Sequence, residues 1–228
     1  MNNIVVTIDG PAGAGKTTAS RLLAERLGCR YIDTGALYRA IALAAHDKGV
    51  DPRDDAALAG LCAGLTLRYE QTASGPRLLS NGSDVTGRLR TPEITMLASA
   101  VSARPVVRRF LLDVQRAIGR EQGGVFEGRD MGTVVFPEAE VKFYLDAPEK
   151  IRALRRYLEL KSDPGLSLDQ VERDLLRRDR NDSTRAAAPL KPAADAIRID
   201  SADLPVEKVV VVMLAHIKRL CAADGCRG

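Results

Sequence analysis

The hydrophobic positions at the start of the chain alternate between strand-like and helix-like spacing. Ile4–Ile8 is a short run of mainly β-branched residues that ends at Asp9-Gly10, which predicts a buried strand. From Lys16 the apolar residues recur at helical spacing. A second short strand over Arg30–Ile32 and a helix over Ala36–Ala45 follow. This alternation predicts an α/β fold with a parallel sheet flanked by helices.

The middle of the chain has a different pattern. Leu65–Glu70 and Arg77–Leu79 predict short strands, and a helical pattern follows over Pro92–Ala103. The strand–helix rhythm stops in this segment and resumes after it. We therefore expect residues 63–103 to be a small insertion of strands and a helix within a single domain of residues 1–228.

The second half returns to the first pattern. Three short apolar runs predict further strands, over Val125–Glu127, Val141–Leu145 and Ile197–Ile199. Helices are expected over Val107–Gly119 and Pro205–Leu220. Two strongly charged helical segments lie between the last two strands, Lys150–Lys161 and Leu168–Arg180, joined by Asp163-Pro164-Gly165.

The composition is that of a globular protein. The chain has 228 residues, of which 45% are hydrophobic and 28% charged. It contains no apolar run of 18 residues, which argues against a membrane span, and its N-terminus does not resemble a secretion signal, so we expect a cytoplasmic location. Aromatic residues make up only 4%, which argues against a surface that stacks nucleic-acid bases.

The cysteine and histidine spacing argues against a zinc site. The four cysteines form no CxxC pair, and the two histidines stand far from them in the sequence. The net charge is only +4, but 26 of the 34 basic residues are Arg. Arginine holds phosphate with a planar fork of donors, which suits an anionic small ligand; GC-biased codon usage would enrich Arg equally well.

The segment from Gly10 to Thr17 matches the phosphate-binding pattern G-x-x-x-x-G-K-[ST]. A predicted strand precedes it and a predicted helix follows it, as the pattern requires. Its glycines let successive backbone N–H groups turn toward phosphate oxygens, and the helix presents its positive end to the same oxygens. Lys16 can reach the β- and γ-phosphates, and the Thr17 hydroxyl can bind Mg²⁺. We therefore expect the chain to bind a nucleoside triphosphate.

Other motifs narrow the class of this P-loop protein. The guanine-reading Asn-Lys-x-Asp of GTPases is missing from the sequence. Large ATPases have an apolar strand ending in Asp, for which Val125–Glu127 and Val141–Asp146 are weak substitutes. The small size and the interrupted α/β pattern favour a kinase that closes over a small acceptor.

Four motifs together resemble the bacterial cytidylate kinases: Asp9–Thr17, Asp33-Thr-Gly-Ala-Leu-Tyr-Arg39, Gly128-Arg-Asp-Met-Gly-Thr-Val-Val-Phe-Pro137 and Arg178-x-x-x-Asp182-Ser-x-Arg185. The resemblance extends over essentially the whole chain. It implies the P-loop nucleoside-monophosphate kinase fold, with residues 63–103 as the insertion that binds the monophosphate and residues 150–166 as a mobile lid. It also implies transfer of a phosphoryl group from ATP, with Mg²⁺, to CMP or dCMP.

The resemblance assigns roles on the ATP side. The ATP-binding residues are Gly10, Pro11, Ala12, Gly13, Ala14, Gly15, Lys16, Thr17 and Thr18, with Thr17 as the metal ligand. Lys16, Arg155 and Arg185 are expected to stabilise the transferring phosphoryl group. Among the lid arginines, Arg155 is our first candidate. The alternative for Arg152 and Arg156 is a charge on the helix surface, and Arg156 fits either interpretation.

The resemblance also assigns residues to the acceptor. Thr34 matches a hydroxyl near the cytosine amino group, Arg39 a phosphate ligand, and Ser99 a contact to the sugar. The competing interpretation for the first two is a helix cap formed by Asp33 or Thr34 and a solvated Arg39.

Arg108 and Asp130 are the candidates for reading the base. A carboxylate can accept from the cytosine amine while an arginine donates to N3 or O2, and uracil would place its O4 acceptor against the carboxylate. The alternative is that Arg108 is a surface charge and Asp130 merely pairs with Arg129.

Four residues within the motifs that begin at Gly128 and at Arg178 complete the acceptor set. The resemblance gives Arg129 and Arg185 contacts to phosphate, and Arg178 and Asp182 contacts to the ribose. The alternatives are an exposed Arg129 and an i,i+4 salt bridge on a solvated helix face.

Two other functions stay open on the sequence alone. One is a kinase for UMP, AMP or another small metabolite; the other is a nucleic-acid-binding ATPase, supported by the basic stretches Arg104–Arg120 and Lys150–Arg185. The expected partners are ATP and CMP or dCMP, with no nucleic acid or membrane, and the default oligomeric state is a monomer.

Overall fold

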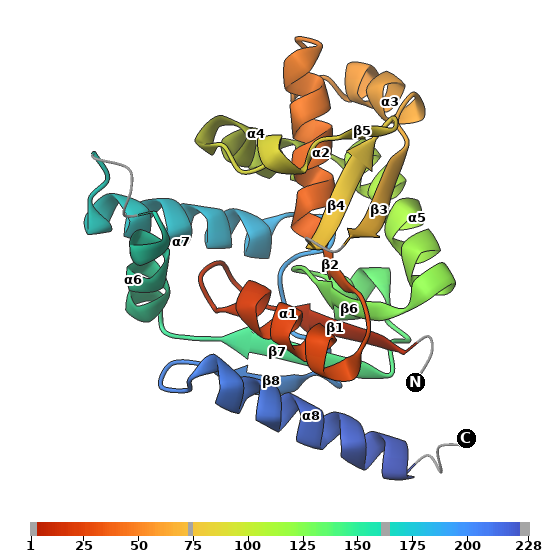
Figure 1. Cartoon of the computed structure of the whole chain (residues 1–228). Coiled ribbons are helices and arrows are strands. Elements are labelled where there is room, and N and C mark those ends of the chain that lie inside the picture. Colours follow the sequence, from red (N-terminus) through yellow and green to blue (C-terminus); the bar gives the residue numbers. More distant parts are fainter. Residues whose placement is uncertain (1–3, 73–74, 161–164, 224–228) are drawn as a thin grey trace. The chain divides into compact units, whose positions relative to one another are not determined.

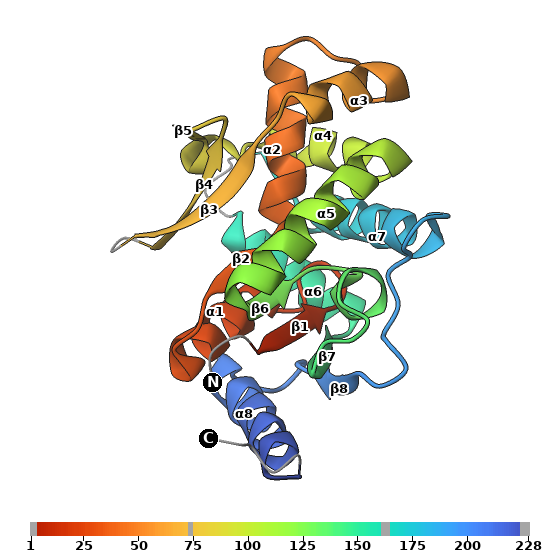
Figure 2. The same cartoon turned by 90° about the vertical axis from the view of Figure 1, so that its right-hand side faces the viewer.

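The computed structural model describes residues 4–72, 75–160 and 165–223. The chain forms two compact units (Figures 1 and 2). One unit comprises the chain up to Tyr31 and from Gly123 onward, and the other is Ile32–Gln122.

The first unit is built on a five-stranded sheet in the order β2-β6-β1-β7-β8. Strand β1 (Val5–Asp9) runs parallel to β6 (Gly124–Glu127) and to β7 (Val141–Asp146), and β7 runs parallel to β8 (Ile197–Asp200). Strand β2 (Tyr31–Asp33) begins in this unit. The expected α/β fold with a parallel sheet is therefore confirmed.

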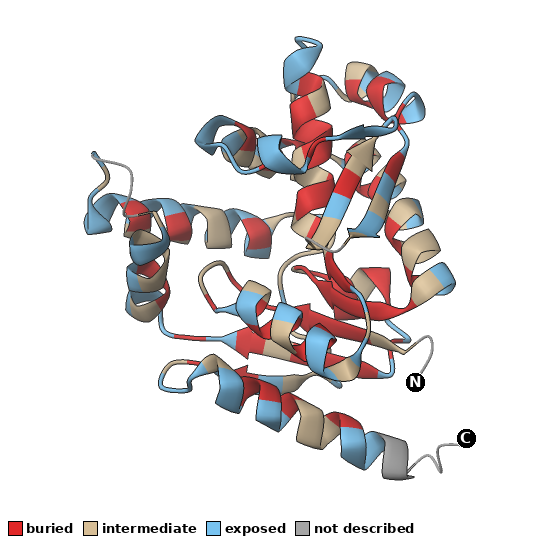
Figure 3. Ribbon diagram, viewed as in Figure 1, coloured by how far each residue is buried: buried red, intermediate tan, exposed pale blue. Residues whose placement is uncertain are grey.

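The helices of this unit are α1 (Lys16–Leu27), α6 (Glu149–Glu159), α7 (Leu168–Thr184) and α8 (Val206–Ala223), with a short π-helical turn η2 (Met131–Val135). Helices α1 and α8 pack against each other, and the core beside them contains Ile8, Leu23, Phe143 and Met213. The central strands are buried along nearly their whole length (Figure 3), which explains their continuous apolar runs.

The second unit combines helices with a three-stranded antiparallel sheet. The strands are β3 (Leu67–Thr72), β4 (Gly75–Ser80) and β5 (Ser83–Asp84). The helices are α2 (Thr34–Asp47), α3 (Asp55–Ala63), a 3₁₀ turn η1 (Thr86–Arg88), α4 (Pro92–Ser102) and α5 (Pro105–Gln122). Buried apolar residues of the helices and of β4 form a core separate from that of the first unit.

The strands and helix expected within residues 63–103 are present, and they belong to the larger unit Ile32–Gln122. The function of this segment as a monophosphate-binding insertion stays a prediction. Asp163 and Pro164, within the expected lid, lie outside the described residues, as does Cys226. Over the described part of the chain, none of the helices has both the length and the apolar character needed to cross a bilayer.

The sequence patterns missed α3 and η2. Helix α3 is short, and Asp54 caps it by accepting hydrogen bonds from the backbone N–H groups of Ala56 and Ala57. The segment Met131–Val135 contains Gly and β-branched residues, which disfavour a helix in isolation. Its conformation depends on contacts with Asp9, a residue more than 120 positions earlier in the chain.

Candidate active site

The phosphate-binding loop joins β1 to α1 in a conformation that only glycine fits at two points. Gly10 has φ 146°, and a Cβ atom there would lie 1.9 Å from the Leu145 carbonyl oxygen. Gly13 has φ 74°, and a Cβ atom there would lie 2.7 Å from the Arg152 carbonyl oxygen. The loop therefore fits directly against the backbone of β7 and α6, which fixes the direction of its N–H groups.

Lys16 is buried beneath this loop, with 4% of its surface exposed. Its ammonium group donates a hydrogen bond to the Pro11 carbonyl oxygen at 2.6 Å. Burial, together with the nearby positive charge of Arg129, lowers the pKa of Lys16 to about 7. A phosphate anion would stabilise the charged form of Lys16. The site therefore places a lysine side chain beside a loop of backbone N–H donors.

Helices α6 and α7 fasten the loop at Ala12. The Arg152 guanidinium donates to the Ala12 carbonyl oxygen at 2.9 Å and pairs with Asp179. Asp179 in turn accepts a hydrogen bond from the Ala12 backbone N–H at 3.1 Å. Arg152 is only 5% exposed, so the alternative of a charge on the helix surface is wrong for this residue.

Arg155 and Arg156, on the same helix, have different environments. Arg155 donates to the Ser201 hydroxyl and to the carbonyl oxygens of Ser201 and Ala202, in the loop after β8. A Cβ atom at Gly15 would lie 3.9 Å from Arg155 Nη1, so this guanidinium borders the phosphate-binding loop. Arg156 forms an exposed pair with Glu159 at 2.8 Å. The contact of Arg155 with the transferring phosphoryl group stays a prediction.

Thr17 begins α1 together with Lys16 and forms part of a chain of oxygen atoms. Its hydroxyl donates to Glu127 Oε1 at 2.8 Å, and the Tyr31 hydroxyl donates to Glu127 Oε2 at 2.6 Å. Glu127 ends β6 and is 8% exposed. A hydroxyl and a carboxylate side by side are hard oxygen ligands, the kind that suits Mg²⁺, so these residues fit the expected ion.

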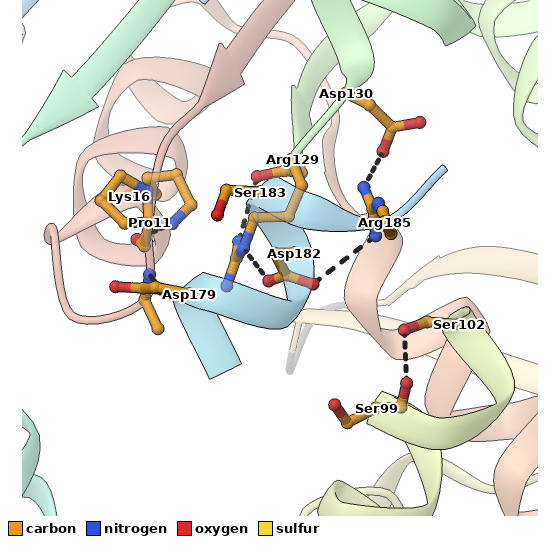
Figure 4. A network of polar contacts seen from close by, with 12 residues as sticks. Pro11, Lys16, Ser99, Ser102, Arg129, Asp130, Asp179, Asp182, Ser183 and Arg185 are labelled. Atoms are coloured by element: carbon orange, nitrogen blue, oxygen red, sulfur yellow. Dashed lines mark hydrogen bonds and ion pairs between the residues drawn. The ribbon is translucent and has the colours of Figure 1, made fainter. Parts of the chain in front are cut away.

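A network of alternating charges lies in the first unit, on the loop after β6 and at the end of α7 (Figure 4). Arg129 lies 3.2 Å from Asp182, Asp182 lies 3.5 Å from Arg185, and Arg185 lies 3.4 Å from Asp130. Asp130 is buried and pairs with Arg185. Arg129 is largely buried, so the alternative of an exposed Arg129 is wrong. Arg178 lies half-buried on α7.

Asp9 ties the loop after β6 to the end of β1. Its carboxylate is 3% exposed and accepts hydrogen bonds from the backbone N–H groups of Met131 (2.9 Å) and Gly132 (2.8 Å). Burial raises the pKa of Asp9 to about 6, because the two N–H donors only partly replace lost hydration. Asp9 therefore positions the segment that follows Arg129 and Asp130.

In the second unit, Asp33 organises the start of α2. Its Oδ1 atom accepts from the Ala36 backbone N–H at 3.1 Å, so the helix cap of the competing interpretation is present at Asp33. Its Oδ2 atom lies 2.7 Å from Arg39 and 3.0 Å from Arg90. Arg39 is 14% exposed, so the alternative of a solvated Arg39 is wrong. Thr34, at the first position of the helix, is buried.

Arg108 is buried in the second unit, which rules out the surface-charge alternative. Its guanidinium donates to the Ser102 carbonyl oxygen at 3.1 Å and lies 5.5 Å from the centre of the Tyr38 ring. Ser99 lies half-buried on α4, and its carbonyl oxygen accepts from the Ser102 hydroxyl (Figure 4). The structure thus gives Arg108 a fixed orientation.

Four residues at these sites were not among those predicted from the sequence: Asp9, Glu127, Asp179 and Arg90. Asp9 and Glu127 are the last residues of adjacent parallel strands, and ligands bind at such strand ends, so their position was a usable signal. Asp179 and Arg90 stand in charged segments where nothing in the spacing distinguishes them.

Comparison with known proteins gives consistent matches along the chain. The sequence profile of the family described as cytidylate kinase matches residues 6–219. A cytidylate kinase of Geobacter sulfurreducens is 52% identical over 208 residues, covering 91% of this chain and 89% of that protein. A cytidylate kinase of Citrifermentans bemidjiense is 48% identical over 225 residues, with 98% and 97% covered. One of Pasteurella multocida is 44% identical, with 96% of both chains covered.

Proposed function

Since the chain belongs to the cytidylate kinase family, we propose that it transfers the γ-phosphoryl group of ATP to CMP or dCMP, producing ADP and CDP or dCDP. The observation that carries this proposal is the phosphate-binding loop with Lys16 buried beneath it, in a chain that matches the family from residue 6 to residue 219. Its location is proposed to be cytoplasmic and its active form a monomer.

On the donor side, the residues from Gly10 to Thr18 hold the triphosphate of ATP. The loop amides and Lys16 bind phosphate oxygens, and these donors are already oriented by the contacts at Gly10, Gly13 and Ala12. Thr17 and Glu127 are the residues that would hold Mg²⁺. When bound with ATP, this ion supplies positive charge that offsets the β- and γ-phosphate oxygens.

On the acceptor side, the proposed roles follow the family motifs. Arg39, Arg129 and Arg185 bind phosphate; Ser99, Arg178 and Asp182 bind the sugar; Thr34, Arg108 and Asp130 bind the base. The fixed orientation of Arg108 and the pairing of Asp130 with Arg185 support the proposal, because base recognition requires groups that do not turn freely.

The proposed reaction needs no covalent enzyme intermediate. An oxygen of the acceptor monophosphate attacks the γ-phosphorus in line, a new P–O bond forms, and the bond to the β-phosphate oxygen breaks to release ADP. Lys16, Arg155 and Arg185 stabilise the charge that spreads over the transferring group. Closure of residues 150–166 would exclude water, which otherwise accepts the phosphoryl group.

The test is ADP release by the purified protein with MgATP and, separately, CMP, dCMP, UMP or AMP. We expect rapid turnover with CMP and dCMP and much slower turnover with UMP. The variant Asp130→Asn should lower kcat/KM for CMP by about tenfold or more and narrow the preference over UMP, because the amide no longer offers only acceptors to the cytosine amine. The matched control is Asp174→Asn, at an exposed carboxylate on α7.

The outcomes separate the parts of the proposal. Equal rates with CMP and UMP would leave a kinase but refute the base-reading role of Asp130 and Arg108. Turnover with UMP or AMP alone would assign a different acceptor. ATP hydrolysis that nucleic acid stimulates and CMP does not would indicate an ATPase acting on nucleic acid.

A further inference from the structure

Two guanidinium groups in the second unit meet at one carboxylate oxygen. Arg39 Nη2 lies 2.7 Å, and Arg90 Nη2 3.0 Å, from Asp33 Oδ2. The other oxygen of Asp33 is engaged at the start of α2, where it accepts from the Ala36 backbone N–H. One negative charge thus faces two positive charges, which leaves this cluster an excess of positive charge and of N–H donors.

The donors of Arg39 are incompletely used. Its Nε atom is buried and, among the described residues, has no hydrogen-bond partner. Leaving such a donor unsatisfied costs free energy, which an oxygen of an anionic ligand would recover. Gly35 permits this arrangement, because a Cβ atom there would lie 3.2 Å from Arg39 Nη1 and 3.1 Å from Asp33 Oδ1.

Arg90 is the accessible partner of this cluster, with 62% of its side chain exposed. Its guanidinium can turn from Asp33 toward an incoming anion without leaving the cluster. A phosphate dianion offers three terminal oxygens, enough to accept from two arginine forks at once. The cluster is therefore matched in charge and in donors to a phosphate monoester.

We propose that Arg90 is a further phosphate-binding residue, which acts with Arg39 to bind the monophosphate of the acceptor nucleotide, and that Asp33 holds the two guanidinium groups together before the acceptor arrives. This inference rests on the proposed function and adds to it a residue that the family motifs in the sequence did not select. The competing explanation is that Arg90 only tethers the segment between η1 and α4 to the start of α2.

The experiment compares CMP with cytidine, which has the same base and sugar but no phosphate. In the variant Arg90→Ala, the KM for CMP should rise by about tenfold, whereas the Ki of cytidine as a competitive inhibitor should stay unchanged. Arg90→Lys keeps the charge but loses the planar fork, so its KM for CMP should lie between those of the unaltered protein and Arg90→Ala. The matched control is Arg88→Ala, two residues away, whose guanidinium pairs with Asp47 at 2.7 Å; it should leave both constants unchanged.

A double variant separates direct binding from positioning. If Arg90 contacts the phosphate, adding Arg90→Ala to Arg39→Ala raises the KM for CMP further; if it only holds Arg39 through Asp33, the second substitution adds nothing. An equal loss of CMP and cytidine binding, or no further change in the double variant, would overturn the proposal. Failure of the proposed function is distinguishable, because then the unaltered protein would not phosphorylate CMP at all.

Discussion

The phosphate-binding loop of the first unit and the arginine cluster at Asp33 of the second unit are built in different ways. The loop is fixed mainly through backbone atoms: the Leu145 carbonyl excludes any side chain at Gly10, and Arg152 and Asp179 bind both polar backbone atoms of Ala12. The arginine cluster is held by the ion pairs of Asp33 with Arg39 and with Arg90, and the Arg90 side chain is largely exposed. The phosphate-binding loop is thus held rigid by contacts to its backbone, whereas the arginine cluster relies on charged side chains that can reorient.

The titrating groups beside the phosphate-binding loop differ from the exposed carboxylates of the second unit. Beside the loop burial dominates: it raises the pKa of Asp9 to about 6 and lowers the pKa of Lys16 to about 7. In the second unit the pKa values of exposed carboxylates shift downward instead, that of Asp47 through hydrogen bonds from Arg88 and that of Asp84 through hydrogen bonds from Thr86. The buried charges beside the loop are therefore costly, whereas hydrogen bonds stabilise the charged form of these exposed carboxylates.

The largest expected effect comes from the buried pair beneath the loop. The variant Arg152→Ala should lower the free energy of unfolding by about 3–5 kcal/mol, because it leaves Asp179 as an uncompensated charge and the Ala12 carbonyl without its donor. Urea unfolding followed by circular dichroism measures this loss. The control Arg156→Ala, on the exposed face of α6, should change it by less than about 1 kcal/mol. If removing Asp179 as well restored no stability, the uncompensated charge would not be the cause.

A smaller effect should appear as pH dependence. The folded-state pKa of Asp9, about 6, lies above its ordinary value of 3.8, so the folded protein binds the extra proton between these values. Relative to Asp9→Asn, the free energy of unfolding should fall by about 3 kcal/mol as pH rises from about 3 to about 7, most steeply between the two pKa values, and stay level above that. Urea unfolding of both proteins across this pH range gives the difference. If the difference in the free energy of unfolding between the two proteins did not depend on pH, the pKa of Asp9 would not be raised in the folded protein.

The smallest effect belongs to the surface of the second unit. Arg88 makes two hydrogen bonds to Asp47, at 2.7 and 2.9 Å, but both side chains are exposed. Arg88→Ala should therefore lower the free energy of unfolding only slightly, far less than Arg152→Ala does, and the difference should shrink further in high salt. Thermal unfolding at low and high salt tests this. If Arg88→Ala lowered the free energy of unfolding as much as Arg152→Ala, the predicted difference between the two regions would be wrong.

The chain's local pattern determined the strands, most helices and the chemistry of the loop. Val5–Asp9, Val141–Asp146 and the helix from Lys16 follow from apolar spacing, and the loop follows from its glycines and Lys16, because these depend on neighbouring residues. Four motifs carried the family resemblance. Through it the sequence predicted the residues of the acceptor set, among them Thr34, Arg39, Arg108 and Asp130.

Tertiary structure alone decided what those residues touch. Asp130 pairs with Arg185 across 55 positions of sequence, Arg152 with Asp179 across 27, and Asp9 reaches Met131 across 122. Spacing cannot reveal such partners, because hydrogen bonds and desolvation depend on which segments fold against each other. For the same reason a surface position for Arg152 stayed open on the sequence, although the residue is buried beneath the phosphate-binding loop. Arg90 became a candidate only through its ion pair with Asp33, which also binds Arg39.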